Sequence, residues 1–193
     1  MYENFLSKFN EKVQLTTAEE DLLKQYLMPK KLRKKQYLLQ EGDICRYICH
    51  VEKGALKAYQ LDEKGEEQIT AFALEGWTIA DLASFFKQEP ATLNIDAIED
   101  AELVLISKAS HDELLTKLPK YETYTRIIIT DAYIALQQRM TIMLHLSVEE
   151  RYLEFTRMCQ QIFQRVPQHM IASSMGLTPE TISRVRSRIS NRK

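Results

Sequence analysis

Four of the five glycines recur at a nearly constant interval in the first half of the chain. Gly42, Gly54, Gly65 and Gly76 are separated by twelve, eleven and eleven residues, in the contexts EGD, EKG, DEKG and EGW. Glycine suits tight corners because it adopts positive φ without steric cost. Turn signals at this spacing, separated by short segments rich in strand formers, are typical of an all-β sandwich, barrel or roll.

The segments around these glycines favour strands. RYICHV, ALKAYQL and QITAFAL lie between them, and DEKG is expected to form a hairpin loop. TLNIDAI and ELVLI add strands after a short apolar helical stretch, ADLASFF. Capping-box spacings at Thr17–Glu20 and Ser110–Glu113 predict flanking helices that begin at these hydroxyl residues. We therefore predict a β-roll with flanking helices over residues 1–119.

A long helix is expected next, because residues 120–146 contain neither glycine nor proline. Two stripes of apolar residues run along this helix. A helix that is apolar on two sides needs two surfaces to pack against. The β-roll and a second copy of the helix would supply them; a core helix of a single domain is the alternative. The predicted dimer seam repeats at heptad spacing and consists of Ile129, Tyr133, Leu136, Met140 and Met143.

The segment QHMIASSMGLTPETISRVRSRI, residues 168–189, fits a helix-turn-helix. Ala172 provides the small side chain where the two helices approach, and Gly176 provides the turn. A capping box at Ser147–Glu150 starts this C-terminal part, for which we predict a domain over residues 147–193. The expected buried set is Ile171, Met175, Leu177, Ile182 and Val185.

The outer face of the second helix carries groups that suit contacts with DNA. Arginine binds guanine through two hydrogen bonds, glutamate accepts from a cytosine amino group, and arginine or lysine binds phosphates. Thr178 is the expected N-cap. A surface helix with solvated arginines is the alternative. The predicted base-contacting set is Thr178, Glu180, Thr181, Arg184, Ser187 and Arg188, and the predicted phosphate contacts are Arg186, Arg192 and Lys193.

The charge distribution agrees with an anionic partner at the C-terminal end. The net charge is −1, yet the last 47 residues hold eight basic and four acidic residues. No stretch approaches the roughly 18 apolar residues of a membrane span, and the N-terminus lacks a secretory signal pattern. With three cysteines and no export signal, reduced thiols and a cytoplasmic location are expected.

These features resemble the cyclic-AMP receptor and fumarate-nitrate reductase regulator (Crp/Fnr) superfamily over essentially the whole chain. The most specific match is GLTPETISRVRSRI, which has a cap at Thr178, the pair Glu180-Thr181, and Arg184. The resemblance implies an α+β fold with a β-roll, a long dimerisation helix and a C-terminal helix-turn-helix whose wing is reduced here. It also implies a homodimer that binds double-stranded DNA, contacts RNA polymerase and responds to a small-molecule effector.

The effector site departs from the family's nucleotide-binding pattern. Relatives that bind cyclic nucleotides carry Gly-Glu before the short helix and Arg-Ser/Thr after it, where this chain has Ala80-Asp81 and Ala91-Thr92. A phosphate buried without its arginine would lack a charge partner. Cyclic AMP is therefore not expected to be the ligand. The residues expected either to line a pocket for another effector or to pack are Trp77, Asp81, Leu82, Phe85, Thr92 and Asn94.

Other functions have less support in the sequence. An iron–sulfur cluster needs about four thiolates, and the histidines show no ligand spacing with the three cysteines, so no metal or other cofactor is expected. An enzyme built on a β-roll would need a histidine-rich metal set or an acid–base pair, and neither is present. The remaining alternative is a small-molecule-binding β-roll whose helical tail contacts a protein.

Overall fold

The computed structural model describes residues 2–190, and the chain divides into two compact units. The first unit comprises Met1–Gln60 and Thr70–Ile129. The second comprises Leu61–Ile69 and Thr130–Lys193. The second unit thus combines the C-terminal helices with a short segment taken from the middle of the strand-rich region.

The strands form two four-stranded sheets with the orders β1-β8-β3-β6 and β2-β7-β4-β5. The sheets are antiparallel where the register is defined, as in the pairing of β3 with β8. This arrangement confirms the predicted β-roll and the α+β class. The strands are β1 Met28–Leu32, β2 Tyr37–Leu39, β3 Tyr47–Lys53, β4 Leu56–Leu61, β5 Glu67–Ala73, β6 Thr78–Ile79, β7 Asn94–Ala97 and β8 Ala101–Ser107.

The expected glycine corners are present, and one of them is also a point of close packing. All four glycines of the first half have φ between +79° and +98°. At Gly54, a Cβ atom would lie 2.6 Å from the carbonyl oxygen of Asp100 and 2.8 Å from the Cα of Ala101. No side chain fits there, because such a contact is shorter than any ordinary van der Waals approach.

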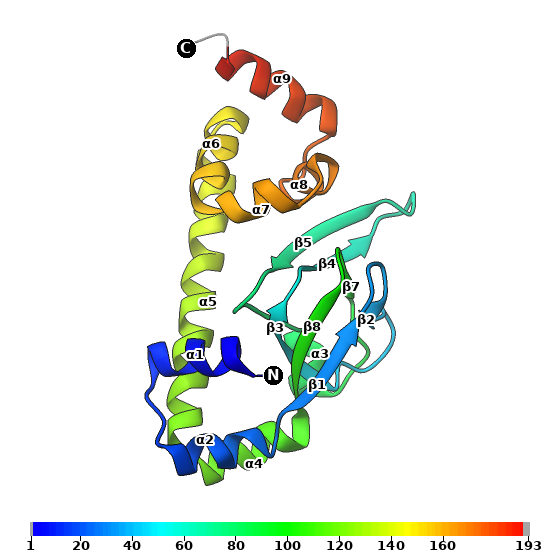
Figure 1. Ribbon diagram of the computed structural model, residues 1–193. Coiled ribbons are helices and arrows are strands. Elements are labelled where there is room, and N and C mark those ends of the chain that lie inside the picture. Colours follow the sequence, from blue (N-terminus) through cyan, green and yellow to red (C-terminus); the bar gives the residue numbers. More distant parts are fainter. Residues whose placement is uncertain (1, 191–193) are drawn as a thin grey trace. The chain divides into compact units, whose positions relative to one another are not determined.

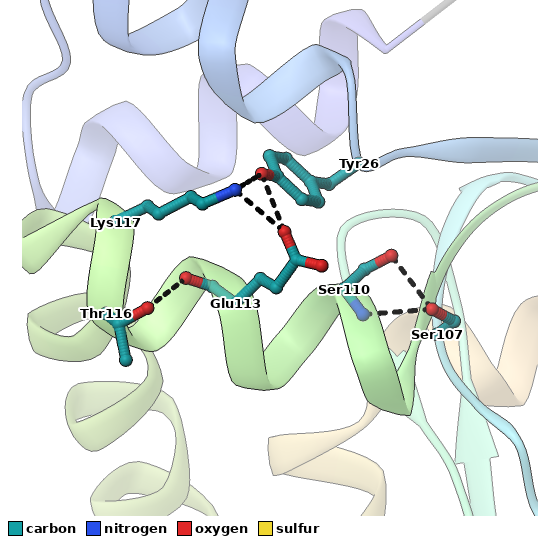
Figure 2. A network of polar contacts seen from close by, with 6 residues as sticks. All are labelled: Tyr26, Ser107, Ser110, Glu113, Thr116 and Lys117. Carbon is teal, nitrogen blue, oxygen red and sulfur yellow. Dashed lines mark hydrogen bonds and ion pairs between the residues drawn. The ribbon is translucent and has the colours of Figure 1, made fainter.

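Two helix starts differ from the sequence prediction. Helix α2, Thr17–Lys24, is capped by Thr16 rather than Thr17, and Glu19 completes the capping box. Helix α4, Lys108–Lys117, is capped by Ser107, whose hydroxyl accepts from the backbone N–H of Ser110 at 3.0 Å (Figure 2). Both predictions were misplaced because neighbouring hydroxyl residues and nearby carboxylates offer more than one cap spacing.

The N-terminus of helix α1, Glu3–Lys12, is bound by a carboxylate from the sheet. Glu52 of β3 accepts from the backbone N–H groups of Asn4 and Phe5 at 3.0 and 3.2 Å. These are orphan donors of the helix N-terminus, where negative charge is favourable. Phe5 and Phe9 of α1 are buried, and the ring of Phe9 stacks on Tyr124 with 4.1 Å between centroids.

A surface network joins the end of α2 to α4 (Figure 2). The Tyr26 hydroxyl donates to Oε2 of Glu113 at 3.1 Å. Lys117 Nζ lies 2.9 Å from the Tyr26 hydroxyl oxygen and 2.9 Å from the same Oε2 atom. The neighbouring Lys117, and then the Tyr26 hydroxyl, lower the pKa of Glu113. Because these side chains are exposed, the network contributes little to stability and mainly fixes local orientation.

Helix α5, Pro119–His145, has 27 residues. Figure 1 draws it as one continuous helix. Tyr121 and Tyr124 are buried and Ile128 packs beside them, so the early part of α5 covers the core of the first unit. Four further helices follow: α6 Val148–Met158, α7 Gln160–Arg165, α8 Gln168–Ser174 and α9 Pro179–Ser190. Ser147 and Glu150 form the expected capping box at α6. Among the described residues after β8 there is no strand.

Candidate DNA-binding face and effector pocket

Helices α8 and α9 are joined by a turn at Gly176, whose φ is +66°. The turn is closed by hydrogen bonds from Gly176 N to Ser173 O at 2.9 Å and from Leu177 N to Ala172 O at 2.9 Å. Ala172 is fully buried, which agrees with its expected place between the helices. Of the predicted buried set, Leu177 is half-buried, and the buried members are Ile171, Met175, Ile182 and Val185.

The N-terminal turn of α9 is capped as predicted. Thr178 Oγ1 accepts from the backbone N–H of Thr181 at 3.3 Å. Glu180 lies in this turn, and the backbone N–H at the helix start, followed by the Thr178 hydroxyl, lowers the pKa of its carboxyl. Glu180 is therefore ionised at neutral pH. Arg184 lies one turn further on, and its Nε donates to the carbonyl oxygen of Glu180 at 3.4 Å.

The predicted DNA-contacting side chains of α9 are directed outward. Thr181 is half-buried, and the exposed members of the set are Thr178, Glu180, Arg184, Arg186, Ser187 and Arg188. Arg192 and Lys193 lie outside the described residues. The sequence prediction omitted Ser183, which is exposed and whose carbonyl accepts from the Ser187 hydroxyl at 3.1 Å. Its position three residues after Glu180 places it beside the same face, a signal available from helical spacing.

The predicted dimer seam of α5 is exposed in the single chain. The exposed fraction is 46% for Ile129 and 67% for Tyr133. The other three members, Leu136, Met140 and Met143, are between 52% and 62% exposed. Large apolar side chains arranged along one face of a helix favour burial against another surface.

Asp81 is committed to the protein's own backbone. Its side chain caps α3, Leu82–Lys87, by accepting from Ser84 N at 3.0 Å, and its second oxygen accepts from Thr92 N at 3.0 Å. The Ser84 hydroxyl in turn accepts from Cys45 N at 2.9 Å. Asp81 is 4% exposed, so both of its oxygens serve the loop rather than facing solvent.

The other five predicted effector-site residues differ in their exposure. Trp77 and Leu82 are exposed, as is Thr92. Phe85 is fully buried with its ring against Phe86, and Asn94 is buried with its side-chain oxygen accepting from Glu41 N at 3.0 Å. Phe85 and Asn94 thus pack within the roll.

A cavity of about 320 Å³ lies in the first unit, and two of its lining residues, Ala80 and Ile95, directly precede Asp81 and follow Asn94 in the chain. Its walls come from four separate stretches of the chain, so the motif at Ala80-Asp81 indicated only part of it. The exposed residues Asp43 and Arg46 bring charge to an otherwise largely apolar lining. The lining residues are Leu38, Leu39, Asp43, Ile44, Cys45, Arg46, Tyr47, Ile79, Ala80 and Ile95.

The thiols of the roll are held in the protonated form. Burial raises the pKa of Cys45, and burial raises the pKa of the completely enclosed Cys49 even further. Within the described part of the chain, no group of three or more potential ligands is placed to hold a metal ion. None of the described helices has both the length and the apolar character required to cross a membrane.

Comparison with known proteins adds independent information. Residues 29–117 match the model of the cyclic nucleotide-binding domain family. The chain is 30% identical over 186 residues to the fumarate and nitrate reduction regulatory protein of Vibrio cholerae, covering 90% of this chain and 74% of that protein. It is 29% identical over 176 residues to the regulatory protein HlyX of Actinobacillus pleuropneumoniae, covering 82% and 70%.

The fold is also found among solved structures. A structure described as a Crp/Fnr-family transcriptional regulator from Eubacterium rectale superimposes with a TM-score of 0.69 at 18% identity, covering 92% of this chain and 85% of that one. The chain belongs to the Crp/Fnr family of transcription regulators.

Proposed function

We propose that this regulator acts as a cytoplasmic homodimer that binds a two-fold symmetric DNA site, with α9 in the major groove. The observation that carries the proposal is the outward face of α9, where ionised Glu180 and Arg184 lie one turn apart beside the capped helix start. Groups at the N-terminal end of a helix reach base edges when the helix enters the groove. The same face carries arginines suited to phosphates.

Selection of bound duplexes from random DNA with the purified protein tests this proposal. We expect an enriched, two-fold symmetric sequence whose half-sites lie about one helical turn apart. Affinity should fall steeply with salt, with a log–log slope of about −0.9 per phosphate contact. Binding that ignores duplex DNA and salt would instead favour a β-roll module whose helical tail contacts a protein.

We further propose that residues 1–119 form the sensor, residues 120–146 the dimerisation helix and residues 147–193 the DNA-binding domain. The exposed apolar seam of α5 supports dimerisation, because a second copy of this helix would cover it. Two copies of α9 would then be related by the same two-fold axis as the DNA site. Contact with RNA polymerase follows from the family resemblance.

We also propose that cyclic AMP is not the effector. Ala91 stands where nucleotide-binding relatives have arginine, and its side chain is 3% exposed, so a phosphate there would have no cationic partner from this position. Asp81 already uses both oxygens for backbone N–H groups. A small effector would occupy the cavity of about 320 Å³ or a site near the predicted residues Trp77, Leu82 and Phe85. Thermal melting with cyclic AMP tests the exclusion: a ligand-dependent increase at micromolar concentration would contradict it.

A further inference from the structure

The side chain of Ser173 binds the edge of a β-strand far away in the sequence. Its hydroxyl donates to the carbonyl oxygen of Glu67 and accepts from the backbone N–H of Ile69 at 3.0 Å. Ser173 lies more than one hundred positions from both Glu67 and Ile69, and all three residues belong to the second unit. The β4–β5 hairpin is therefore attached to the first helix of the helix-turn-helix.

The geometry explains why a hydroxyl is needed at this position. Strand β5 is the last strand of its sheet, and alternate residues of an edge strand point their N–H and C=O groups away from the sheet. Glu67 and Ile69 are two residues apart and so present a carbonyl and an amide on the same side. A serine hydroxyl donates one hydrogen bond and accepts another, so Ser173 satisfies both groups as a neighbouring strand would.

A second contact holds the same end of α8. Arg139 of α5 donates from Nη2 to the carbonyl oxygen of Ser174 at 2.9 Å. The last carbonyls of a helix lack partners within the helix and attract cations. The C-terminal turn of α8 is thus held by α5 through Arg139 and by the β4–β5 hairpin through Ser173.

These contacts leave the DNA-contacting face open. While Ser173 is bound to β5, the side chains of Glu180, Arg184 and Arg188 remain exposed. The attachment therefore fixes the helix-turn-helix without covering it. We propose that Ser173 is a positioning residue that fastens α8 to the β4–β5 hairpin and holds α9 ready for DNA.

The attachment is tested by amide hydrogen exchange of the full chain without DNA. Ser173→Ala should accelerate exchange of the Ile69 amide about tenfold, because that amide loses its acceptor. Ser174→Ala is the matched control, since the Ser174 hydroxyl donates to Ile171 O within its own helix. Ser173→Thr retains the hydroxyl and should restore slow exchange. Unchanged exchange at Ile69 in Ser173→Ala, or equal acceleration in the roll at the Ile95 amide, would overturn the attachment.

The positioning role rests on the proposed DNA binding and is measured separately, with the duplex obtained from random selection. Ser173→Ala should weaken binding about three- to tenfold while base preference stays unchanged, because a preorganised site is lost and no DNA contact is removed. Unchanged affinity together with faster exchange at Ile69 would overturn the positioning role. If the wild-type chain bound no duplex, the proposed function would fail, whereas the exchange measurement would still decide the attachment.

Discussion

The carboxylate of Asp81 accepts a hydrogen bond from the backbone N–H of Thr92 at 3.0 Å and so closes the loop that contains α3. Its other oxygen caps that helix at Ser84. Relatives that bind cyclic nucleotides have a glutamate at the first position and a serine or threonine at the second. In this chain, the two positions bind each other, and the segment that would surround a nucleotide is closed by an internal bond.

Replacing Asp81 should therefore destabilise the roll. Asp81→Ala leaves the N–H groups of Ser84 and Thr92 without their acceptor, and we expect a loss of roughly 1–3 kcal/mol of unfolding free energy, measured by urea denaturation. Asp43→Asn, on a neighbouring exposed loop, is the control and should change stability little. Equal stability of the Asp81 and Asp43 variants would contradict a structural role for the Asp81 carboxylate.

The glycine corners should differ in their tolerance of alanine. Gly42→Ala introduces a Cβ into open space and is expected to cost only the strain of positive φ, roughly 1–2 kcal/mol. Gly54→Ala adds a collision with the backbone of Asp100 and Ala101 and should cost clearly more. Thermal or urea unfolding of the two variants provides the comparison, and a smaller loss at Gly54 would show that the 53–54 turn can move away from Asp100.

The face of α9 should determine base preference. Arg184→Ala and Glu180→Ala are each expected to relax the selected DNA sequence at one position, at about 1–3 kcal/mol per lost contact. Arg186→Ala should instead weaken all duplexes alike, as a phosphate contact would. Arg157→Ala removes an exposed arginine that pairs with Glu154 of α6, and serves as the control. Base preference that is identical in Arg184→Ala and wild type would exclude this face as the specificity surface.

The exposed seam of α5 should hold the dimer together. Leu136→Glu places a charge in the centre of the seam and is expected to raise the dimer dissociation constant at least about tenfold, as measured by analytical ultracentrifugation. Gln138→Glu adds the same charge away from the seam and should leave the dimer intact. Dissociation in both variants, or in neither, would argue against the predicted seam.

A buried histidine should make the first unit sensitive to acid. His50 lies between Phe5 and Thr78, and burial lowers its pKa from 6.5 to about 4. The unfolded chain therefore binds this proton first, and stability falls as the pH decreases from about 6.5 towards 4, by at most roughly 3 kcal/mol. Above pH 6.5 this group adds no pH dependence.

His50→Gln should flatten the stability curve between pH 6.5 and 4, as followed by urea denaturation at a series of pH values. Some slope should remain, because burial also lowers the pKa of His111. His145→Gln, at the exposed end of α5, is the control. A curve for His50→Gln that is as steep as the wild-type curve would show that His50 is not kept neutral by burial.

Local patterns in the sequence located most of the helices and strands and the outward face of α9. Glycine spacing located the corners of the β-roll, and the apolar spacing around Ala172 and Gly176 located the paired helices. Both signals depend on φ, ψ and side-chain direction over a few residues, and these are local properties of the chain. The capping box at Ser147 was located in the same way, although those near Thr16 and Ser107 were displaced by adjacent hydroxyl residues.

Only the tertiary structure decided which distant groups meet. The cavity brings together residues from Leu38 to Ile95, Asp81 closes a loop on Thr92, and Ser173 binds a strand more than one hundred residues away. Such contacts leave no periodic trace, because a single hydroxyl or carboxylate has the same appearance in a sequence whether water or a folded backbone satisfies it. The sequence by itself therefore determined most of the helices and strands and the outward face of α9, while chain packing determined the interior of the roll and the attachment of α8.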